Sequence, residues 1–400
     1  MTSIGKIKSI DEADFSGKRV LVRLDLNVPV KEGKVSDTTR LDRIVPTLKQ
    51  LVQKQAKVIV LSHFGRPKGQ RHEDMSLKPI AETLSGMLPG VSLNFAPDCI
   101  GDVAHQVVQN LGNGQILILE NVRFYSGEES NDESFSSELA RLGDVYVNDA
   151  FSVSHRAHAS TAGIAMHLPA FAGPSLMAEI KALSAALDQP KRPVAALVGG
   201  AKISTKIPVL SNLIQKVDKL IIGGGMANTF LFAQEKNVGK SLCEPDFSDM
   251  ARNIMAQAKA GNCEILLPLD AVVAKEFKEG AESSVVDINS VSSDSMILDA
   301  GPETLKMLCD ELKLCKTLLW NGPLGAFEIN PFGQATFALA QEAAKLTQEG
   351  QLVTIAGGGD TVAALNLAQV TETFTYVSTA GGAFLEWLEG RDLPGIKALT

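Results

Sequence analysis

The chain has 400 residues, of which 45% are hydrophobic and 21% charged, and this length predicts about two to three domains with a sizeable buried core. The 38 Lys and Arg residues against 46 Asp and Glu residues give a formal net charge of −8, which argues against a nucleic-acid-binding protein. The same composition excludes disordered, collagen-like and coiled-coil chains.

Short apolar segments alternate with amphipathic segments along almost the whole chain. The segments that predict strands are 19–28, 57–63, 115–120, 145–149, 193–199, 219–223, 264–268, 316–320, 352–356 and 374–378. The segments that predict helices are 39–54, 77–88, 133–142, 204–215, 248–260, 303–313 and 333–347. Because buried parallel strands connected by helices give this alternation, we expect an α/β fold with parallel sheets covered on both faces.

A helical pattern at 175–187 divides the chain into two lobes of similar size. It follows Pro169, Gly173 and Pro174, and it is followed by the sequence Asp-Gln-Pro-Lys-Arg-Pro. These helix-breaking residues on both sides predict a helix that connects two Rossmann-like α/β lobes. The segment 391–400 is too short to form a domain and must pack on one of the lobes.

Nothing in the sequence predicts export or a membrane segment. The first residues lack the apolar segment of a signal peptide, and the longest segment without Asp, Glu, Lys or Arg, 157–178, contains two histidines and two prolines. The five cysteines form no C-x-x-C pair, which is typical of reduced thiols. We therefore expect a soluble, cytoplasmic protein without membrane or nucleic-acid partners.

Basic and hydrogen-bonding side chains follow four predicted strands of the first lobe. Nine of the twelve arginines lie in the first 160 residues, and all six histidines lie between His63 and His167. The side chains after these strands are Asp25, Asn27, His63, Arg66, Arg123, His155, Arg156 and His158. One such arginine alone would fit an ordinary surface, but together they lie beyond the carboxyl ends of parallel strands, where ligands bind. Because the guanidinium fork matches phosphate and carboxylate oxygens, the group predicts a site for a small polyanion.

Arg40 lies in the first turn of a predicted helix, with Thr39 as the expected N-cap and Asp42 at the capping-box position. A cation at this place opposes the helix dipole. Either the helix tolerates that cost, or an anion binds beside Arg40.

The second lobe has no histidine, and glycines follow its predicted strands at 199–202, 223–226, 321–323 and 357–361. Glycines at a strand-to-helix junction let backbone N–H groups approach a phosphate. A single cluster would also fit tight packing. Four clusters together with Lys202 and Lys206 favour a nucleotide phosphate site.

Two acidic residues of this lobe have two interpretations each. Asp360 could begin a helix or bind Mg²⁺, which takes one or two carboxylates plus phosphate oxygens. Glu328 could bind a ribose or be an ordinary loop residue. The familiar motifs are absent: Gln234 stands where a P-loop ending at 239–241 needs glycine, and Asn228 and Val362 interrupt G-x-G-x-x-G.

Seven motifs, in order over essentially the whole chain, make the sequence similar to the phosphoglycerate kinase family. They are VRLDLNVP (22–29), SHFGRP (62–67), LENVRF (119–124), NDAFSVSHRAHAS (148–160), GGAKISTK (199–206), NGPLGAFE (321–328) and GGGDT (357–361). Leu26 replaces the usual Phe, Ser152-Val153-Ser154 replaces Gly-Thr-Ala, and Thr361 replaces Ser. None of these changes removes a charged group.

The resemblance implies that the first lobe binds 3-phosphoglycerate or 1,3-bisphosphoglycerate and the second binds Mg²⁺ with ADP or ATP. The implied substrate-binding residues are Asp25, Leu26, Asn27, Arg40, His63, Phe64, Gly65, Arg66, Arg123 and Arg156. The implied nucleotide-binding residues are Lys206, Glu328, Gly357, Gly358, Gly359, Asp360 and Thr361, with Asp360 on the metal. The groups implied to act on the transferred phosphoryl are Arg40, Lys202, Lys206, Gly358 and Gly359.

The resemblance also implies a monomer in which the C-terminal segment returns to the first lobe. The expected domains are 1–173 with 391–400, an interdomain helix at 174–189, and 190–390. Because the two substrates are expected on different lobes, direct in-line transfer without a covalent intermediate needs a hinge, expected at 169–193 and near 390.

Three other functions fit parts of the pattern: a nicotinamide dehydrogenase, a hinged non-enzymic anion-binding protein, and an inactive relative of the kinases. The sequence does not separate a role in glycolysis from one in carbon fixation, because the reaction is the same.

Overall fold

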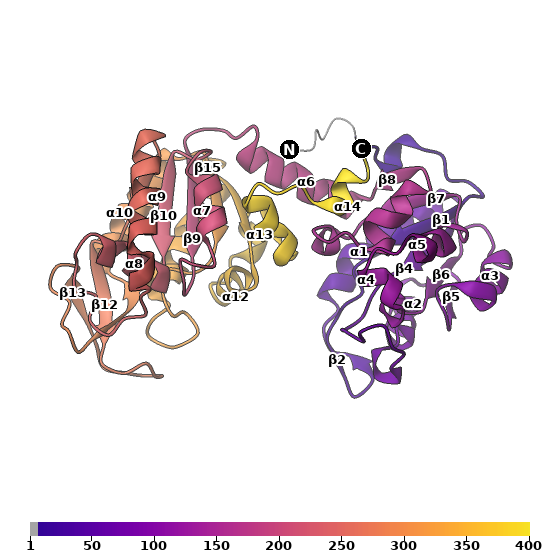
Figure 1. Ribbon diagram of the computed structural model, residues 1–400, viewed down its shortest axis with the longest axis horizontal. Helices are drawn as coiled ribbons and strands as arrows, with labels where there is room; N and C mark the ends of the chain where they lie inside the picture. The colour runs from indigo at the N-terminus through magenta and orange to yellow at the C-terminus, as the bar shows by residue number, and fades with distance from the viewer. Residues whose placement is uncertain (1–6) are drawn as a thin grey trace. The chain divides into compact units, whose positions relative to one another are not determined.

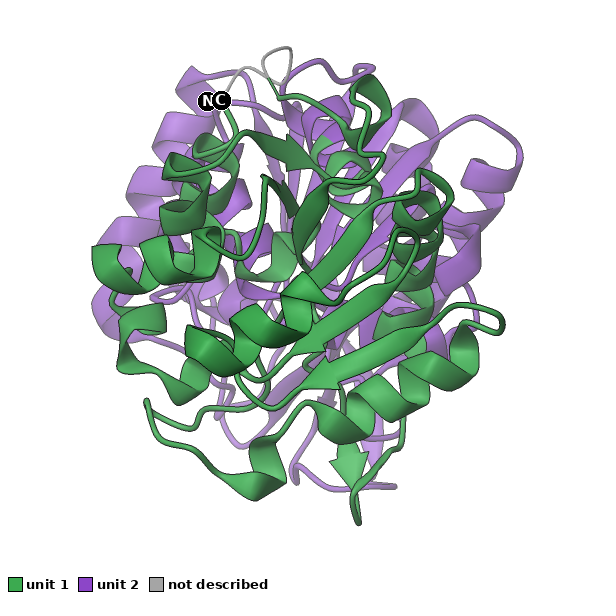
Figure 2. Ribbon diagram, turned by 90° about the vertical axis from the view of Figure 1, so that its right-hand side faces the viewer, with its two compact units in different colours: residues 1–180, 392–400 green, residues 181–391 purple. Residues whose placement is uncertain are grey.

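The computed structural model describes residues 7–400 and shows two compact α/β units, residues 1–180 with 392–400 and residues 181–391 (Figure 2). Each unit has a six-stranded sheet whose strands are all parallel. The expected fold class is confirmed. No helix in the described part of the chain is long and apolar enough to cross a membrane.

The sheet of the first unit has the strand order β5-β6-β4-β1-β7-β8 (Figure 1). The strands are β1 (Arg19–Arg23), β4 (Lys57–Leu61), β5 (Leu93–Ala96), β6 (Ile116–Leu119), β7 (Val145–Asn148) and β8 (Ala170–Ala172). Arg23 pairs with Leu61 on one side and with Asn148 on the other, so β1, β4 and β7 end at the same level. A small hairpin, β2 (Val30–Lys31) and β3 (Lys34–Val35), follows β1.

Helices and short turns complete the first unit. The α-helices are α1 (Thr39–Gln53), α2 (Lys78–Met87), α3 (Gly101–Gln109), α4 (Ser126–Glu129), α5 (Glu133–Ala140), the first half of α6 (Pro174–Leu187) and α14 (Pro394–Lys397). The short turns are η2 (Ile10–Glu12), η3 (Glu73–Met75), η4 (Val122–Phe124), η5 (Phe151–Val153), η6 (Ala159–Gly163) and η7 (Ile164–Met166). On α1, Leu41, Leu48 and Leu51 recur at helical spacing and are buried in the core with β1 and β4, so the amphipathic pattern places this helix against the sheet.

The second unit has the strand order β11-β10-β9-β15-β16-β17 and a separate antiparallel sheet, β13-β12-β14. The parallel strands are β9 (Val194–Gly199), β10 (Lys219–Gly223), β11 (Glu264–Leu266), β15 (Thr317–Asn321), β16 (Val353–Gly357) and β17 (Tyr376–Ser378). The antiparallel strands are β12 (Asp270–Ala274), β13 (Ser283–Asp287) and β14 (Met296–Ala300).

The helices of this unit are the second half of α6, α7 (Ile207–Leu213), α8 (Gly225–Ala233), α9 (Ser248–Ala260), α10 (Pro302–Leu314), α11 (Gln334–Gln348), α12 (Gly359–Leu367) and α13 (Gly382–Leu388), with short turns η8 (Pro245–Phe247) and η9 (Thr371–Thr373) (Figure 1). α8 and α12 each begin directly after a strand and a glycine, which places their N-termini at the carboxyl edge of the sheet.

Two expected helix starts are wrong in detail. α1 begins at Thr39 itself, with Thr38 at the N-cap position, and the Thr38 hydroxyl donates to Asp42 at 3.0 Å. The helix expected from 204 begins at Ile207, where Pro208 occupies the first turn and needs no N–H partner. Lys206 is therefore the N-cap residue, and Lys202 lies in the preceding loop.

Candidate functional site

The residues that follow β1, β4, β6 and β7 form one hydrogen-bonded cluster in the first unit. The Asp25 carboxylate accepts from the Arg40 guanidinium at 3.2 Å and from the Ser152 hydroxyl at 2.6 Å. Arg40 also donates to the Asn27 carbonyl at 2.8 Å. Arg40 is thus positioned by the loop after β1, although its own helix would favour an acidic residue there.

The loop after β4 is fixed from both sides by amide and guanidinium groups. The Gly65 N–H donates to Asn27 Oδ1 at 3.0 Å, and Arg123 donates to the Gly65 carbonyl at 2.9 Å. Asn121 Nδ2 donates to the Phe64 carbonyl at 2.7 Å. These contacts bring together the segments that the sequence predicts to meet at the sheet edge.

Not every predicted substrate residue offers its side chain to a ligand. Leu26 is buried in the core of the first unit, and its N–H donates to the Ser62 hydroxyl, so it supports the loop. Phe64 is half-buried against the same core. Arg66 is exposed, and within residues 7–400 its guanidinium has no hydrogen bond or ion pair. Arg156 is exposed too and donates to His155 at 3.2 Å.

His63 is buried beside Arg23, whose guanidinium lies 3.0 Å from Nδ1 of the imidazole. Burial lowers the pKa of His63 well below its ordinary value, and the positive charges of Arg23 and Arg123 lower it further. His63 is therefore neutral at physiological pH. The positive charge in this cluster comes from the arginines.

Glycines at the strand ends of the second unit let three loops approach very closely. A Cβ added at Gly199 would lie 2.0 Å from the Pro323 carbonyl oxygen, and one at Gly322 would lie 2.2 Å from the Gly199 carbonyl oxygen. Tight packing is thus one reason for these glycines. The loops enclose a cavity of about 320 Å³ whose wall includes Lys202, Lys206 and residues 358–361.

Lys206 lines this cavity and is held by a side chain of the sheet edge. Its ammonium donates to Asn321 Oδ1 at 2.8 Å, and Asn321 Nδ2 donates to the Gly357 carbonyl at 2.7 Å. Burial lowers the pKa of Lys206, while the charges of Asp360 and Glu389 oppose this shift. One asparagine therefore fixes both the lysine and the glycine-rich end of β16.

The N-terminus of α12 forms another part of the wall. Gly358 has a φ of +100°, a conformation that favours glycine, and the helix starts at Gly359 with Asp360 in its first turn. The Thr361 hydroxyl is buried and accepts from the Gly322 N–H at 2.7 Å. The hydroxyl of Thr361 therefore holds the neighbouring loop.

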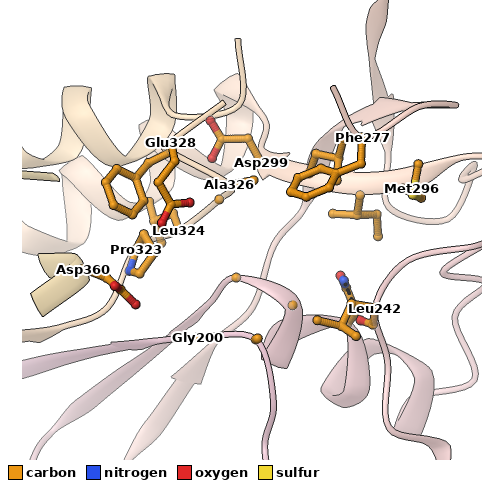
Figure 3. A pocket seen from close by; sticks show the side chains of 18 of the residues that line it. Gly200, Leu242, Phe277, Met296, Asp299, Pro323, Leu324, Ala326, Glu328 and Asp360 are labelled. Carbon is orange, nitrogen blue, oxygen red and sulfur yellow. Dashed lines mark hydrogen bonds between the residues drawn. The ribbon is translucent and has the colours of Figure 1, made fainter. Parts of the chain in front are cut away.

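A larger cavity of about 560 Å³ adjoins the first, and Gly200, Ala201 and Asp360 line both. Figure 3 shows Glu328 and Asp360 near Pro323 at one end, with Phe277, Met296 and Leu242 toward the other. The apolar end suits a flat hydrophobic ring, and the carboxylate end adjoins the lysine cavity.

A magnesium ion would fit beside Asp360 only with help from a ligand. The Asp360 side chain is exposed at the boundary of the two cavities. Among residues 7–400, no group of three or more His, Cys, Asp or Glu side chains could hold a metal. One carboxylate matches the way Mg²⁺ binds through phosphate oxygens and water.

The sequence interpretation overlooked several residues of these sites. Ser152 and Asn121 hold the first cluster, Asn321 positions Lys206, and Lys240 lines the larger cavity. Asn121 and Asn321 lie inside quoted motifs directly after strands, which is the signal that could have identified them. Met296, Ile297 and Leu298 of the unexpected strand β14 also line this cavity.

Two α/β units, one with arginines on its hydrogen-bonded loops and one with a glycine-rich, lysine-bearing cavity, define an enzyme that handles phosphorylated small molecules. The family model described as "Phosphoglycerate kinase" matches residues 10–391. The chain belongs to the phosphoglycerate kinase family. It is a kinase that carries out the reversible phosphoryl transfer of glycolysis on small-molecule substrates.

Individual phosphoglycerate kinases are similar to this chain over nearly the full length of both proteins. Phosphoglycerate kinase of Sinorhizobium medicae is 57% identical over 393 residues, covering 98% of both chains, and that of Cereibacter sphaeroides ATCC 17025 is 56% identical, covering 98% of this chain and 99% of its own. The structure of phosphoglycerate kinase from Coxiella burnetii has a TM-score of 0.91 at 44% identity, with 98% of each chain covered. The dehydrogenase and the non-enzymic binding protein are therefore wrong as interpretations.

Proposed function

We propose that the enzyme transfers a phosphoryl group reversibly between 1,3-bisphosphoglycerate and ADP, giving 3-phosphoglycerate and ATP, with Mg²⁺ required. The observation that carries this assignment is the pair of adjoining cavities in the second unit, where Lys206 and the N-terminus of α12 meet an apolar pocket. A nucleotide has the matching parts, a polyanionic chain and a flat base.

The phosphoglycerate would bind at the arginine cluster of the first unit. Arg66, without a protein partner among the described residues, and the exposed Arg156 are free to pair with phosphate or carboxylate oxygens. Asp25 and Asn27, which are held in the same cluster, offer acceptors to the substrate hydroxyl. The first unit therefore supports recognition of a small molecule with two anionic ends.

The nucleotide would bind with its base in the larger cavity and its phosphates in the smaller one. Glu328, exposed at the carboxylate end of the larger cavity, would accept from the ribose. Lys206 and the amides of residues 358–361 would face the phosphates. Asp360 would hold Mg²⁺ together with phosphate oxygens, and the bound ion would offset negative charge on the nucleotide.

Transfer would proceed directly, without a covalent intermediate on the protein. The loose transition state spreads charge over three equatorial oxygens, and cations or amides aimed at them lower the barrier. Arg40, Lys202, Lys206 and the amides of Gly358 and Gly359 would supply these groups.

Closure of the two lobes, with hinges at 169–193 and near 390, would bring the substrates in line and exclude water from the acyl phosphate. We also propose that the enzyme acts as a monomer in the cytoplasm. All residues that we assign to the two sites belong to one chain, and the glycolytic family supports the location.

A coupled assay tests the reaction and the role of Asp360. With ATP, Mg²⁺ and 3-phosphoglycerate, added glyceraldehyde-3-phosphate dehydrogenase should report 1,3-bisphosphoglycerate through oxidation of NADH, and EDTA should abolish the signal. Asp360→Asn should raise the Mg²⁺ concentration needed for half-maximal rate. Asp249→Asn, which changes an acidic residue in the first turn of α9 outside both cavities, is the matched control. Activity that persists in EDTA would contradict the metal requirement.

A further inference from the structure

A buried arginine, Arg23, contacts His63 of the predicted phosphoglycerate site. Arg23, the last residue of β1, has no exposed surface, and the function proposed above does not use it. Its Nε donates to the Ser160 hydroxyl at 2.9 Å, and one terminal nitrogen donates to the Leu24 carbonyl at 2.5 Å. The other terminal nitrogen lies 3.0 Å from Nδ1 of His63.

The chemistry of arginine decides the protonation of His63. A guanidinium stays charged in proteins and has donors only, so Nδ1 of His63 must be the acceptor in this contact. An imidazole that uses Nδ1 as an acceptor carries its single proton on Nε2. The Arg23 contact therefore selects one tautomer of His63 and opposes a second proton on the ring.

The charge of Arg23 is balanced by a buried carboxylate that reaches it through a serine. Glu128 of α4 has no exposed surface, and it accepts from the Ser160 hydroxyl at 2.6 Å and from the Ser160 N–H at 2.9 Å. Burial alone would raise the pKa of Glu128, but the nearby imidazole of His158, the charge of Arg23 and the hydrogen bonds from Ser160 lower it overall. Glu128 is therefore ionised and holds Ser160 so that its oxygen faces Arg23.

We propose that Glu128, Ser160 and Arg23 form a positioning chain that keeps His63 neutral, with its proton on Nε2, as a donor to the phosphoglycerate. The proposal rests on the proposed function, which places His63 at the substrate. In this arrangement His63 contributes a directed neutral hydrogen bond. Electrostatic attraction comes from the arginines around it, so substrate binding does not depend on the titration of His63.

The surroundings of His63 support a neutral ring. The charged and titratable groups that face it come from several elements: Arg23 on β1, Arg40 on α1, Arg123 on η4 and His158 before η6. All of them, when charged, are positive. The carboxylate of Glu128 faces Arg23 and lies 3.7 Å from His158.

Nitrogen-15 NMR of the histidine-labelled protein tests the tautomer directly. The protein has six histidines, and the resonances of His63 are assigned by their loss in His63→Gln. We expect an unprotonated Nδ1 and a protonated Nε2 that do not titrate between pH 5.5 and 8, and a shift of the Nε2–H resonance when 3-phosphoglycerate is added. A proton on Nδ1, or titration near the ordinary value of about 6.5, overturns the proposal.

Kinetics of Arg23→Met separates positioning from a general structural effect. Burial and Arg123 still lower the pKa of His63 in this variant, but the pKa rises relative to the wild type because the charge of Arg23 is gone. Imidazolium then forms at a higher pH than in the wild type and strengthens substrate binding at low pH. Relative to the wild type, KM for 3-phosphoglycerate should therefore fall further between pH 8 and pH 6, by at most about fivefold, because a charge-assisted hydrogen bond is roughly twice as strong as a neutral one. Titration of the substrate itself cancels in this ratio.

Two further variants keep the test decisive. Arg19→Met, at the exposed start of the same strand, should leave the pH dependence of KM unchanged. Arg23→Lys, whose ammonium also only donates, should restore the wild-type profile, and it serves if Arg23→Met does not fold. An Arg23→Met profile parallel to the wild type overturns the positioning role. Absence of both activity and 3-phosphoglycerate binding in the wild type would instead reject the proposed function.

Discussion

Lys206 is half-buried and held in one direction. Substitution of this lysine therefore tests most directly whether the second unit stabilises the phosphates by electrostatic interaction. Its ammonium lies in the cavity wall, held by Asn321 at 2.8 Å. Lys206→Ala should lower kcat by about 10²–10³, the usual effect of removing one preorganised electrostatic group. Steady-state kinetics in the coupled assay measures this change.

A lysine outside the site provides the control for that prediction. Lys259, exposed in the last turn of α9, lines neither of the two cavities, so Lys259→Ala should keep the wild-type kcat. An unchanged kcat in Lys206→Ala would remove this lysine from the mechanism.

Arg66 should behave differently, because it is exposed and has no partner among the described residues. If Arg66 only binds a substrate phosphate far from the reacting atoms, Arg66→Ala weakens the binding of the ground state and of the transition state equally. KM for 3-phosphoglycerate should then rise about tenfold or more with little change in kcat. A loss confined to kcat would show that Arg66 acts on the transferred group.

At this scale, charged residues were easier to predict than their supports. His63 follows a strand, Lys206 follows a glycine cluster and Arg40 lies at the start of a helix, and each of these placements can be read from the local sequence pattern. Asn321 positions Lys206 across 115 residues of sequence, and Ser152 reaches Asp25 across 127. Such contacts depend on how the strands align in the sheet, which no local pattern records.

Asp149 links three elements of the first unit and makes their stability depend on pH. It follows β7, accepts from the Leu176 N–H in the first turn of α6 at 2.8 Å, and accepts from the Thr47 hydroxyl of α1 at 2.5 Å. Burial raises its pKa from 3.8 to about 6, an effect that these hydrogen bonds only partly offset. The folded state therefore binds the proton of Asp149 more tightly than the unfolded state does.

The sign of the effect follows from that difference. Above pH 6 the folded protein carries a buried charge that costs about 3 kcal/mol, and below pH 4 the carboxyl is neutral in both states and the cost disappears. Asp149→Asn removes the titration. As pH rises from 4 to 7, the variant should gain about 3 kcal/mol of unfolding free energy relative to the wild type.

Hydrogen exchange of peptides from β1 and β7 in urea, at several pH values, measures this difference in the first unit. Asp144→Asn is the control, because Asp144 pairs with Arg19 at the surface and its pKa is lowered below 3.8, so that it stays ionised from pH 4 to 7 in the folded protein. A difference between wild type and Asp149→Asn that does not change with pH would contradict the raised pKa.

The elements that the sequence predicts well share a clear physical pattern. The central parallel strands are continuous apolar segments and were found with small shifts at their ends. The antiparallel sheet β13-β12-β14 was not predicted. Its strand β13 is mostly exposed, and β12 follows β11 so closely in one apolar segment that the two were not separated. α8 was missed for the opposite reason: nearly all of its residues are buried, so it shows no amphipathic period.

Across the whole molecule, the order of strands and helices was enough to predict two parallel α/β units. The alternation is repeated many times, and parallel connections of this kind allow few other arrangements. The return of the chain's end to the first unit has no such local signal. It depends on contacts of 392–400 with loops more than two hundred residues earlier.

Those contacts predict what the C-terminal segment does for the first unit. Leu393, Ile396 and Leu399 are buried, the Gly395 N–H donates to the Ser154 carbonyl at 2.8 Å, and Asn148 Nδ2 donates to the Gly395 carbonyl at 3.0 Å. Removal of residues 392–400 should cost the first unit on the order of 5 kcal/mol, from three buried aliphatic side chains.

Because Ser154 lies two residues before Arg156, the truncated enzyme should also bind 3-phosphoglycerate more weakly, which titration calorimetry measures. Gly395→Ala gives a milder version of the same test, since its Cβ would lie 2.9 Å from Ser154 Cα and force the two segments apart. Lys397→Ala, exposed on the same short helix, should leave both stability and binding unchanged. A truncated enzyme with wild-type stability and wild-type affinity for 3-phosphoglycerate would show that the segment supports neither the unit nor its substrate loop.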